Sequence, residues 1–372
     1  MLGCGLRRGY ADLKPVNVLE YEELARARLS QGAFDFIAGG AEDEVTLRAN
    51  RAAFQRLQLL PRVLVDVSHV DMSTEVLGRR IEFPVMLAPV ALQRLAHPDG
   101  EPAAARAAAA AGTVMVLSTM SSYTLEEVAQ AAEGPRWFQL YCFRDREATK
   151  RLVLRAAAAG YEALCLTVDL GRLGRRERDL RNALVFPPDV LPMNLATDAE
   201  LTGGQLPSTV YAAGLMNPSP AWEIDPALTW ADIDWLRSLT SMPVLLKGIL
   251  RADDAGIAAD HGVAGIVVSN HGGRQLDGAP AAIDVLPEIV EAVGDRCEVL
   301  MDGGVRRGSD IVKALALGAK AVLIGRPYVW GLAARGERGV AHVLELLRAE
   351  LEVAMALTGV TSVSQISRSL VR

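Results

Sequence analysis

Eight short runs of apolar and β-branched residues recur along the sequence, and they constrain the fold more than any other feature. The runs are residues 84–91, 113–119, 136–142, 163–169, 243–249, 265–270, 299–305 and 321–326. Short runs that are apolar throughout are typical of parallel strands buried on both faces. The stretches between them, such as TLEEVAQAA and GSDIVKALALG, are rich in helix-forming Ala and Leu. Eight strand-then-helix units predict a (β/α)8 barrel.

An open, doubly wound sheet is the competing layout for alternating strands and helices. It is disfavoured because the first strand is not followed by the G-x-G-x-x-G turn of dinucleotide-binding sheets. The chain has 372 residues and a mass of 39.8 kDa, which one large barrel with additions can accommodate. We therefore expect a single domain over residues 17–372, preceded by a flexible lead-in at residues 1–16.

Three segments lie outside the eight units. Residues 17–60 have the pattern of helices packed ahead of the barrel, and residues 338–357 that of a closing helix. Residues 186–228 follow the fourth strand and are rich in proline and glycine. This connection is far longer than a usual barrel loop, which predicts a mobile lid or a partly disordered segment.

Charge and composition exclude several classes of protein. The net charge is −6, and acidic and basic residues are interspersed without a basic block. This pattern argues against a nucleic-acid or anionic-membrane partner and favours a small ligand. No run approaches the roughly 18 apolar residues of a membrane span, and the C-terminal SLVR is not a peroxisomal address. The four cysteines lack metal-site spacing, so we expect reduced thiols, no metal and a cytoplasmic location.

Polar residues gather where the predicted strands end. In a (β/α)8 barrel these ends converge on the active site, so such residues are candidates for function. They are Gln139, Tyr141, Thr167, Asp169, Arg176, Lys247, Ser269, His271, Arg274, Asp302, Gly304 and Arg306.

His271 is the natural candidate for a general base, because the ordinary pKa of histidine lies nearest neutrality. A structural histidine at a strand end is the alternative. Gly272 and Gly273 favour the functional interpretation, since they leave room for a flat ligand beside the backbone. Arg274 would then clamp a carboxylate in two parallel hydrogen bonds, with Arg176 as a second clamp. The alternative for both arginines is an ordinary ion pair.

Asp169 and Lys247 complete the candidate chemistry. Asp169 would hold the imidazole and stabilise its protonated form, or else would only cap the following helix. Lys247 ends an apolar strand, so its ammonium needs an anion or an electron-rich partner inside the barrel mouth. Structural pairing of Lys247 with Asp302 is the alternative.

The last two units carry a phosphate-binding pattern. DGGVRRG follows the seventh strand and IGRP the eighth, so that glycine amides, Arg306 and Arg326 lie where barrels commonly hold phosphate. This pattern implies a nucleotide-like cofactor with one phosphate. A lyase or isomerase whose own substrate is phosphorylated remains an alternative.

With these residues in hand, the sequence resembles the FMN-dependent α-hydroxy-acid oxidases and dehydrogenases, which include glycolate, lactate, long-chain hydroxy-acid and mandelate enzymes. The resemblance covers about residues 17–370 and rests mainly on SNHGGRQLDG at 269–278. It is supported by FQLY at 138–141, LTVD at 166–169, GRRERDLRN at 174–182, LLKG at 245–248 and MDGGVRRG at 301–308. It implies FMN in a (β/α)8 barrel and oxidation of an (S)-2-hydroxy acid to the 2-oxo acid.

The resemblance also implies roles for individual residues. The catalytic group would be His271, Asp169, Tyr141 and Lys247. The substrate would be bound by Arg274, Arg176, Tyr141, Phe36 and Met120. The cofactor would be bound by Pro89, Val90, Ala91, Ser118, Gln139, Thr167, Lys247, Ser269, Asp302, Gly304, Arg306, Gly325 and Arg326.

Two of these positions depart from the family's pattern. Phe36 replaces a tyrosine of many members, and Met120 replaces a tryptophan of short-chain glycolate oxidases. Both changes put apolar, adaptable groups in place of polar or wide ones, which favours a substrate with a medium or large aliphatic or aryl side chain.

The resemblance also bears on the electron acceptor and the assembly. We expect oxygen as the acceptor, giving hydrogen peroxide, because the chain has no haem domain and no apolar insert in the lid. A dehydrogenase that uses a quinone or another acceptor is the nearest alternative, and a non-catalytic binding barrel is a distant one. By resemblance alone we expect a homo-oligomer, a tetramer or an octamer.

Overall fold

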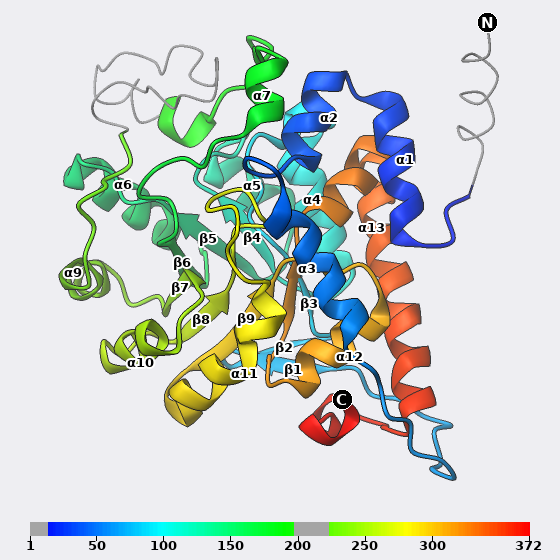
Figure 1. The fold of residues 1–372 in the computed structure, drawn as a ribbon. Coiled ribbons are helices and arrows are strands. Elements are labelled where there is room, and N and C mark those ends of the chain that lie inside the picture. Colours follow the sequence, from blue (N-terminus) through cyan, green and yellow to red (C-terminus); the bar gives the residue numbers. More distant parts are fainter. Residues whose placement is uncertain (1–13, 197–222) are drawn as a thin grey trace, which may run out of the picture.

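The eight predicted strands form a closed barrel in the computed structural model, which describes residues 14–196 and 223–372. Each strand pairs in parallel with the next, and the last closes on the first (Figure 1). The barrel strands are β3 (Val85–Leu87), β4 (Met115–Ser118), β5 (Arg136–Leu140), β6 (Ala163–Thr167), β7 (Val244–Ile249), β8 (Gly265–Val268), β9 (Glu298–Asp302) and β10 (Val322–Ile324). The (β/α)8 prediction is confirmed, and the open sheet is excluded.

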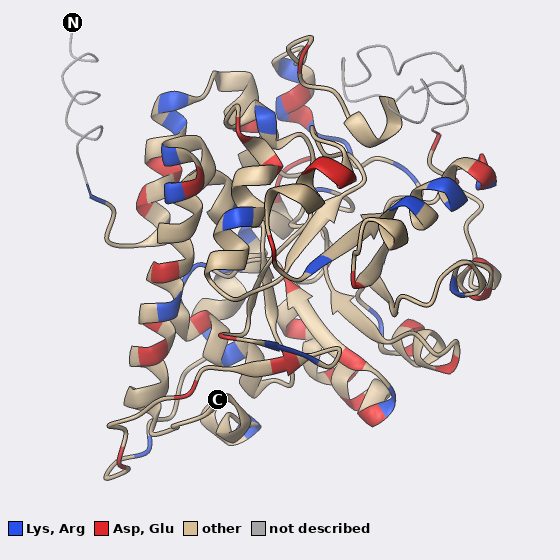
Figure 2. Ribbon diagram, turned by 180° about the vertical axis from the view of Figure 1, so that it is seen from behind, with Lys and Arg blue, Asp and Glu red and all other residues tan. Residues whose placement is uncertain are grey.

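Helices surround the barrel. Those that follow the barrel strands are α4 (Gly100–Ala110), α5 (Leu125–Ala131), α6 (Arg146–Ala158), α7 (Glu177–Arg181), α9 (Ala231–Leu239), α10 (Ala252–Asp260), α11 (Ala282–Val293), α12 (Gly308–Ala316) and α13 (Arg326–Thr358). Short 3₁₀ turns are η1 (Gln93–Leu95), η4 (Gly294–Arg296), η5 (Val363–Gln365) and η6 (Arg368–Leu370). Lys and Arg alternate with Asp and Glu over this outer layer, in agreement with the interspersed charge of the sequence (Figure 2).

The side chains of each barrel strand alternate between two hydrophobic layers, as the period of two of a strand requires. In β6, Leu164 and Leu166 pack outward against the helices, whereas Cys165 packs inside the barrel. The interior layer contains Met86, Val116, Trp137, Cys165, Leu245, Val267, Leu300 and Leu323. All of these are at most 1% exposed, so the axis of the barrel is filled with side chains.

A hairpin that the sequence analysis missed closes one end of the barrel. It consists of β1 (Thr74–Val76) and β2 (Arg79–Ile81), paired antiparallel ahead of the first barrel strand. Val76 and Ile81 are fully buried and belong to the interior layer. Because β2 leads directly into β3, the hairpin lies at the end where the strands begin, opposite the expected active site.

The N-terminal helices agree with the prediction, and the closing helix differs from it. Helices α1 (Val18–Arg28), α2 (Gln31–Ala38) and α3 (Val45–Arg56) occupy the segment predicted at 17–60. The closing helix α13 begins at Arg326 instead of 338. Its backbone leaves helical geometry at Arg335 and Gly336, where φ is +58° at the glycine, so it is two helices joined at a kink. The predicted helix corresponds to the second part.

The predicted lid at 186–228 falls largely outside the described residues. Its first part is fastened to the barrel, because the buried Asn194 side chain donates to the Thr119 carbonyl at 3.1 Å and accepts from the Leu125 amide at 2.7 Å. Phe186 packs edge-on against Phe36, with ring centroids 5.3 Å apart. Residues 186–196 of the predicted lid therefore pack against the barrel and the N-terminal helices, and the mobility of the lid stays a prediction. Most of the predicted lead-in also lies outside the described residues.

Within residues 14–196 and 223–372, no helix combines the length and the apolar character needed to cross a membrane.

Candidate active site

The strand alternation places one residue, near or directly after the end of each strand, in a layer above the filled interior. These residues lie two positions beyond interior residues. They are Ala88, Ser118, Gln139, Thr167, Lys247, Ser269, Asp302 and Gly325. All except Ser269 line a cavity at the C-terminal end of the barrel, which encloses about 1140 Å³ including space open to solvent. We call Ser118, Gln139, Thr167, Lys247 and Asp302 the floor of this cavity.

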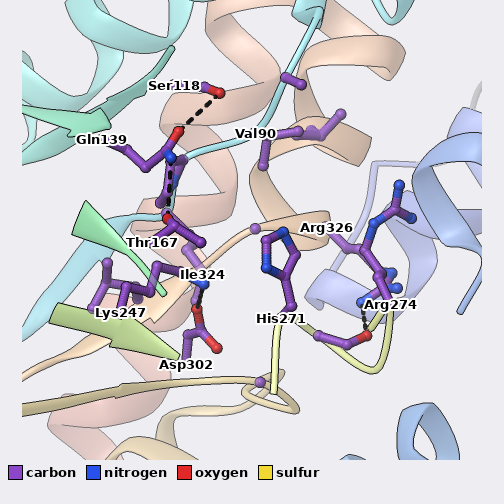
Figure 3. A pocket seen from close by; sticks show the side chains of 18 of the residues that line it. Val90, Ser118, Gln139, Thr167, Lys247, His271, Arg274, Asp302, Ile324 and Arg326 are labelled. Atoms are coloured by element: carbon purple, nitrogen blue, oxygen red, sulfur yellow. Dashed lines mark hydrogen bonds and ion pairs between the residues drawn. The ribbon is translucent and has the colours of Figure 1, made fainter. Parts of the chain in front are cut away.

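One side of the floor is a chain of hydrogen bonds between three strands. The Ser118 hydroxyl donates to Gln139 Oε1 at 3.2 Å, and Gln139 Nε2 donates to Thr167 Oγ1 at 3.0 Å (Figure 3). All three side chains are buried. Such a chain fixes the orientation of the amide and presents donors and acceptors in fixed positions to a polar ligand.

The other side of the floor is an ion pair. Lys247 Nζ lies 3.1 Å from Asp302 Oδ2 (Figure 3). It also donates to Ser269 Oγ at 3.0 Å. Burial acts to lower the pKa of Lys247, but Asp302 and Asp169 outweigh it, so the pKa is raised and the ammonium persists. The ion pair between Lys247 and Asp302, which the sequence left open as an alternative, is present in the structure. Lys247 also lines the cavity, so the ion pair does not exclude a role in the site. Ser269 lies behind Lys247, away from the cavity.

His271 projects into the cavity from the turn after β8 (Figure 3). Its Nδ1 lies 2.8 Å from Asp169 Oδ1, which leaves Nε2 as the ring nitrogen available to a ligand. Burial lowers the pKa of His271, with Lys247 acting in the same direction and Asp169 opposing it. Burial also acts to raise the pKa of Asp169, but His271 and Lys247 outweigh it and the pKa is lowered. A neutral imidazole held by a carboxylate is the arrangement of a general base.

Two guanidinium groups reach the cavity beside His271. Arg274 Nη1 donates to the Phe36 carbonyl at 2.7 Å and to the Gly39 carbonyl at 2.9 Å, and its guanidinium lies 5.3 Å from the centroid of the Phe36 ring. Arg176 lines the same cavity, and its buried Nε has no hydrogen-bond partner among the described residues. The two groups make this part of the cavity suited to an anion. We call Phe36, Met120, Arg176 and Arg274 the rim.

A second pair of arginines lies at another side of the cavity. Arg326 donates to the backbone carbonyls of Ile37, Ala38, Gly39 and Gly272. Arg306 donates to the Val305 carbonyl and lies over the Trp330 ring. Burial, followed by repulsion from Arg326, lowers the pKa of Arg306 to about 9. Burial also lowers the pKa of Arg326, to about 10. Two desolvated guanidinium groups that repel each other indicate a site for an anion.

The comparisons with known proteins agree with this geometry. The sequence matches the FMN-dependent dehydrogenase family over residues 25–372. The chain belongs to the FMN-dependent dehydrogenase family. It is 55% identical to an L-lactate oxidase from Nostoc sp. over 95% of this chain and 97% of the relative. It is 53% identical to a peroxisomal (S)-2-hydroxy-acid oxidase from Oryza sativa subsp. japonica over 96% of both chains. A solved mandelate oxidase with benzoyl-formic acid has a TM-score of 0.87 and 46% identity, over 96% of this chain and 98% of that one.

The residues of this member of the FMN-dependent dehydrogenase family fit FMN. Arg306 is buried and Arg326 is half-buried, and the two guanidinium groups suit a phosphate. Gly303 and Gly304 have φ of +92° and +87°, which turns the backbone sharply beside these arginines. Asp302 Oδ1 is buried without a partner among the described residues and suits a ribityl hydroxyl. The polar floor suits a flavin ring, which carries both donors and acceptors.

The structure brings nearly all the predicted site residues together. Besides the floor and the rim, the cavity is lined by Pro89, Val90, Ala91, Tyr141, His271, Gly304, Arg306, Gly325 and Arg326. Asp169 and Ser269 are the exceptions, and they contact His271 and Lys247 from behind. Apolar wall residues escaped the sequence analysis: Ile37, Leu170, Leu173, Val305, Leu323, Ile324 and Val329. Leu170 and Leu173 lie in irregular backbone ahead of α7, so neither a helical nor a strand period in the sequence marks this wall.

Proposed function

We propose that this FMN-dependent enzyme oxidises an (S)-2-hydroxy acid to the 2-oxo acid and reduces oxygen to hydrogen peroxide. One observation carries the proposal: His271 and Arg274 extend from one turn into the cavity whose floor fits FMN. A base and a carboxylate clamp side by side suit a substrate that bears a hydroxyl next to a carboxylate. The oxidases among the relatives support the same chemistry and the same acceptor.

Substrate binding begins with the carboxylate. Arg274 and Arg176 hold it, and the hydrogen bonds of Arg274 to the Phe36 and Gly39 carbonyls fix the direction of its guanidinium. Tyr141 lines the same cavity and holds the substrate through its phenol. A substrate held at its carboxylate has its adjacent carbon in a defined position relative to His271, which lowers the entropic part of the barrier.

His271 then accepts a proton at Nε2. Asp169 accepts the hydrogen bond from Nδ1–H and stabilises the imidazolium that forms. FMN bound on the floor would supply the acceptor for the electron pair that leaves the α-carbon, and oxygen would be the final acceptor of that pair. In the net reaction the acid loses two electrons and two protons, and oxygen takes them up as hydrogen peroxide.

Floor residues would hold the cofactor. Gln139, Ser118 and Thr167 would hydrogen-bond the ring, with backbone groups of Pro89, Val90 and Ala91 beside it. The Lys247 ammonium would stabilise negative charge on the ring. Asp302, Gly304, Arg306, Gly325 and Arg326 would bind the ribityl chain and phosphate.

The rim supports an acid with a medium or large side chain. Phe36 and Met120 line the cavity and are apolar, and Phe186 packs against the Phe36 ring. A methionine thioether adapts its shape to different neighbours, so aliphatic and aryl groups can both pack here. We therefore propose a substrate longer than glycolate.

A cytoplasmic homo-oligomer, a tetramer or an octamer, is also part of this proposal. Light scattering on the purified protein measures its mass, and fractionation of its native cells measures its compartment. A monomer, or enrichment in an organelle, would refute the respective part.

The test of the activity is an anaerobic screen of the purified holoenzyme. Glycolate, L-lactate, 2-hydroxyoctanoate and (S)-mandelate are mixed with it, and loss of the oxidised-flavin absorbance is recorded. Admission of air should restore the absorbance and form one peroxide for each 2-oxo acid that the reaction has produced. Bleaching that persists in air would favour a dehydrogenase with another acceptor. Protein that binds no FMN would favour a lyase or isomerase with a phosphorylated substrate.

A further inference from the structure

A buried pair of asparagines lies directly beneath the His271 turn. Asn50 Nδ2 donates to Asn270 Oδ1 at 2.9 Å, and Asn270 Nδ2 donates to Asn50 Oδ1 at 2.8 Å. Both side chains are at most 4% exposed, and they lie 220 residues apart in the sequence. Two reciprocal hydrogen bonds between planar amides fix the separation and the relative orientation of the two groups.

Asn270 connects the asparagine pair to His271, the proposed base. It immediately precedes His271, whose φ of +58° is uncommon and strained for a residue with a side chain. Asn270 Oδ1 also accepts from the Gly273 amide at 3.1 Å, and its Nδ2 also donates to the Pro280 carbonyl at 2.9 Å. The asparagine therefore holds both sides of the turn from which His271 projects.

Asn50 also contacts the glycine turn after β9. A Cβ added at Gly303 would lie 3.5 Å from the Asn50 side chain, and one at Gly304 would lie 2.2 Å from the Asn50 carbonyl oxygen. The next residue, Arg51, donates to the Gly304 carbonyl and to Asp310 Oδ2. One turn of α3 thus touches both the turn that carries the base and the turn assigned to the cofactor.

Helix α3 is itself firmly placed. Its N-terminus has no side-chain cap of its own, and instead Asp277 accepts from the Val45 amide at 3.1 Å and the Thr46 amide at 2.8 Å. Its C-terminus is tied by Arg56 to Asp284 at 2.6 Å. In Figure 1 the helix lies beside the barrel between α2 and α12. A rigid helix can hold a strained turn in place because it is anchored at both ends.

We propose that Asn50 is a positioning residue for His271, which sets the direction of the imidazole through Asn270. The inference rests on the proposed function for its kinetic consequence. Asn50 touches neither substrate nor reacting atoms. It acts mainly on the chemical step, because the Arg274 guanidinium is also held by the Phe36 and Gly39 carbonyls, whereas the imidazole of His271 lacks such backbone contacts among the described residues.

Rapid-mixing measurements on Asn50→Leu holoenzyme test this inference. Leucine has a similar volume but forms neither hydrogen bond. We expect the limiting rate of flavin reduction, corrected for FMN content, to fall by about tenfold or more, because small displacements of reacting groups carry such costs. The substrate dissociation constant should stay within about threefold. Should Asn50→Leu not fold, Asn50→Ala removes the same bonds without adding a branch.

Arg56→Gln is the matched control, since it loosens the same helix at its far end and should reduce flavin at the wild-type rate. A limiting rate for Asn50→Leu within about twofold of wild type would overturn the inference. So would an equal loss in Arg56→Gln, which would show a general effect of the helix.

A crystal structure of the Asn50→Leu holoenzyme gives a second readout that needs no substrate. We expect the distance from His271 Nδ1 to Asp169 Oδ1 to exceed hydrogen-bonding range, and an unchanged 2.8 Å would overturn the inference. If no 2-hydroxy acid reduced the wild-type flavin, the proposed function would fail, and this distance would still decide the role of Asn50.

Discussion

The floor and the rim of the cavity are built in different ways. Floor residues sit on barrel strands, are buried, and bond to one another across neighbouring strands, as Gln139 does to Thr167. Rim residues come from helices and loops distant in sequence, and Arg274 is held by backbone carbonyls at the end of α2. Strand register therefore fixes the floor, whereas the rim depends on how separate segments pack. We expect the floor to carry the chemistry that is common to the family. We expect the rim to determine which substrate is bound.

The largest effect should come from His271, which lies between the two regions. His271→Ala keeps the floor intact, so the variant should retain FMN while substrate-driven flavin reduction falls by about 10²- to 10⁴-fold. Anaerobic stopped-flow absorbance measures the rate, and the flavin-to-protein ratio is the control. Near-normal reduction would remove His271 from the mechanism.

A substitution in the floor should damage cofactor binding and folding together. Lys247→Met leaves Asp302 as a buried, unpaired carboxylate, which costs about 3–5 kcal/mol in similar buried pairs. We expect a clear loss of unfolding free energy in denaturant and a lower FMN content. Arg251→Met, at an exposed ion pair, serves as the control. Equal stabilities would show that the floor pair is not structurally important.

A conservative substitution in the rim should spare the cofactor. Arg274→Lys keeps the charge but loses the planar fork, so the substrate dissociation constant should rise by about ten- to a hundredfold with FMN content unchanged. Titration of the oxidised enzyme with a 2-hydroxy acid under anaerobic conditions gives the constant. Unaltered affinity would contradict a carboxylate clamp.

The pH profile tests how burial acts on the base. His271 must be neutral to accept a proton, and burial lowers its pKa below the ordinary 6.5. Activity should therefore persist as the pH falls through 6.5 and decline only at the lower pKa. The acid limb of kcat/KM measures this pKa in the free enzyme. A midpoint above 6.5 would mean that Asp169 outweighs burial.

The smallest effect should come from resizing the rim. Met120→Trp replaces an adaptable side chain by a wide one, so the ratio of kcat/KM for 2-hydroxyoctanoate to that for glycolate should fall by about tenfold. Met115→Leu, in the outer layer of β4, is the control. An unchanged ratio would show that Met120 does not contact the substrate side chain.

The barrel and most of the residues that line the cavity could be predicted from the sequence, because both follow from patterns among residues that are close together in the chain. The strands are apolar throughout, and glycines and arginines mark the phosphate side. The β1–β2 hairpin was not predicted, because half of residues 74–81 are polar and only Val76 and Ile81 are buried, so the segment lacks the apolar run of a barrel strand. The start of α13 was not predicted, because Arg326 and Pro327 were interpreted as part of the IGRP phosphate-binding motif. In addition, a kink at Gly336 interrupts the helix, so only its second part has a continuous helical pattern.

Contacts between distant segments could not be predicted from these patterns. The Asn50–Asn270 pair and the packing of Phe36 on Phe186 depend on how loops fold over the barrel. The resemblance implies that Ser269 binds the cofactor. In the structure its hydroxyl accepts from the Lys247 ammonium and from the His271 amide, contacts that depend on the turn after β8 and that no strand pattern predicts.

The β1–β2 hairpin has a consequence for how molecules reach the cavity. It covers the end of the barrel where the strands begin, and the packed interior layer fills the axis above it. Diffusion along the axis is thereby blocked, so the acid reaches the cavity by the approach at the opposite end, where the cavity is open to solvent. Crowding of that approach by excess acid would slow reoxidation, which should be visible as inhibition at high substrate concentration.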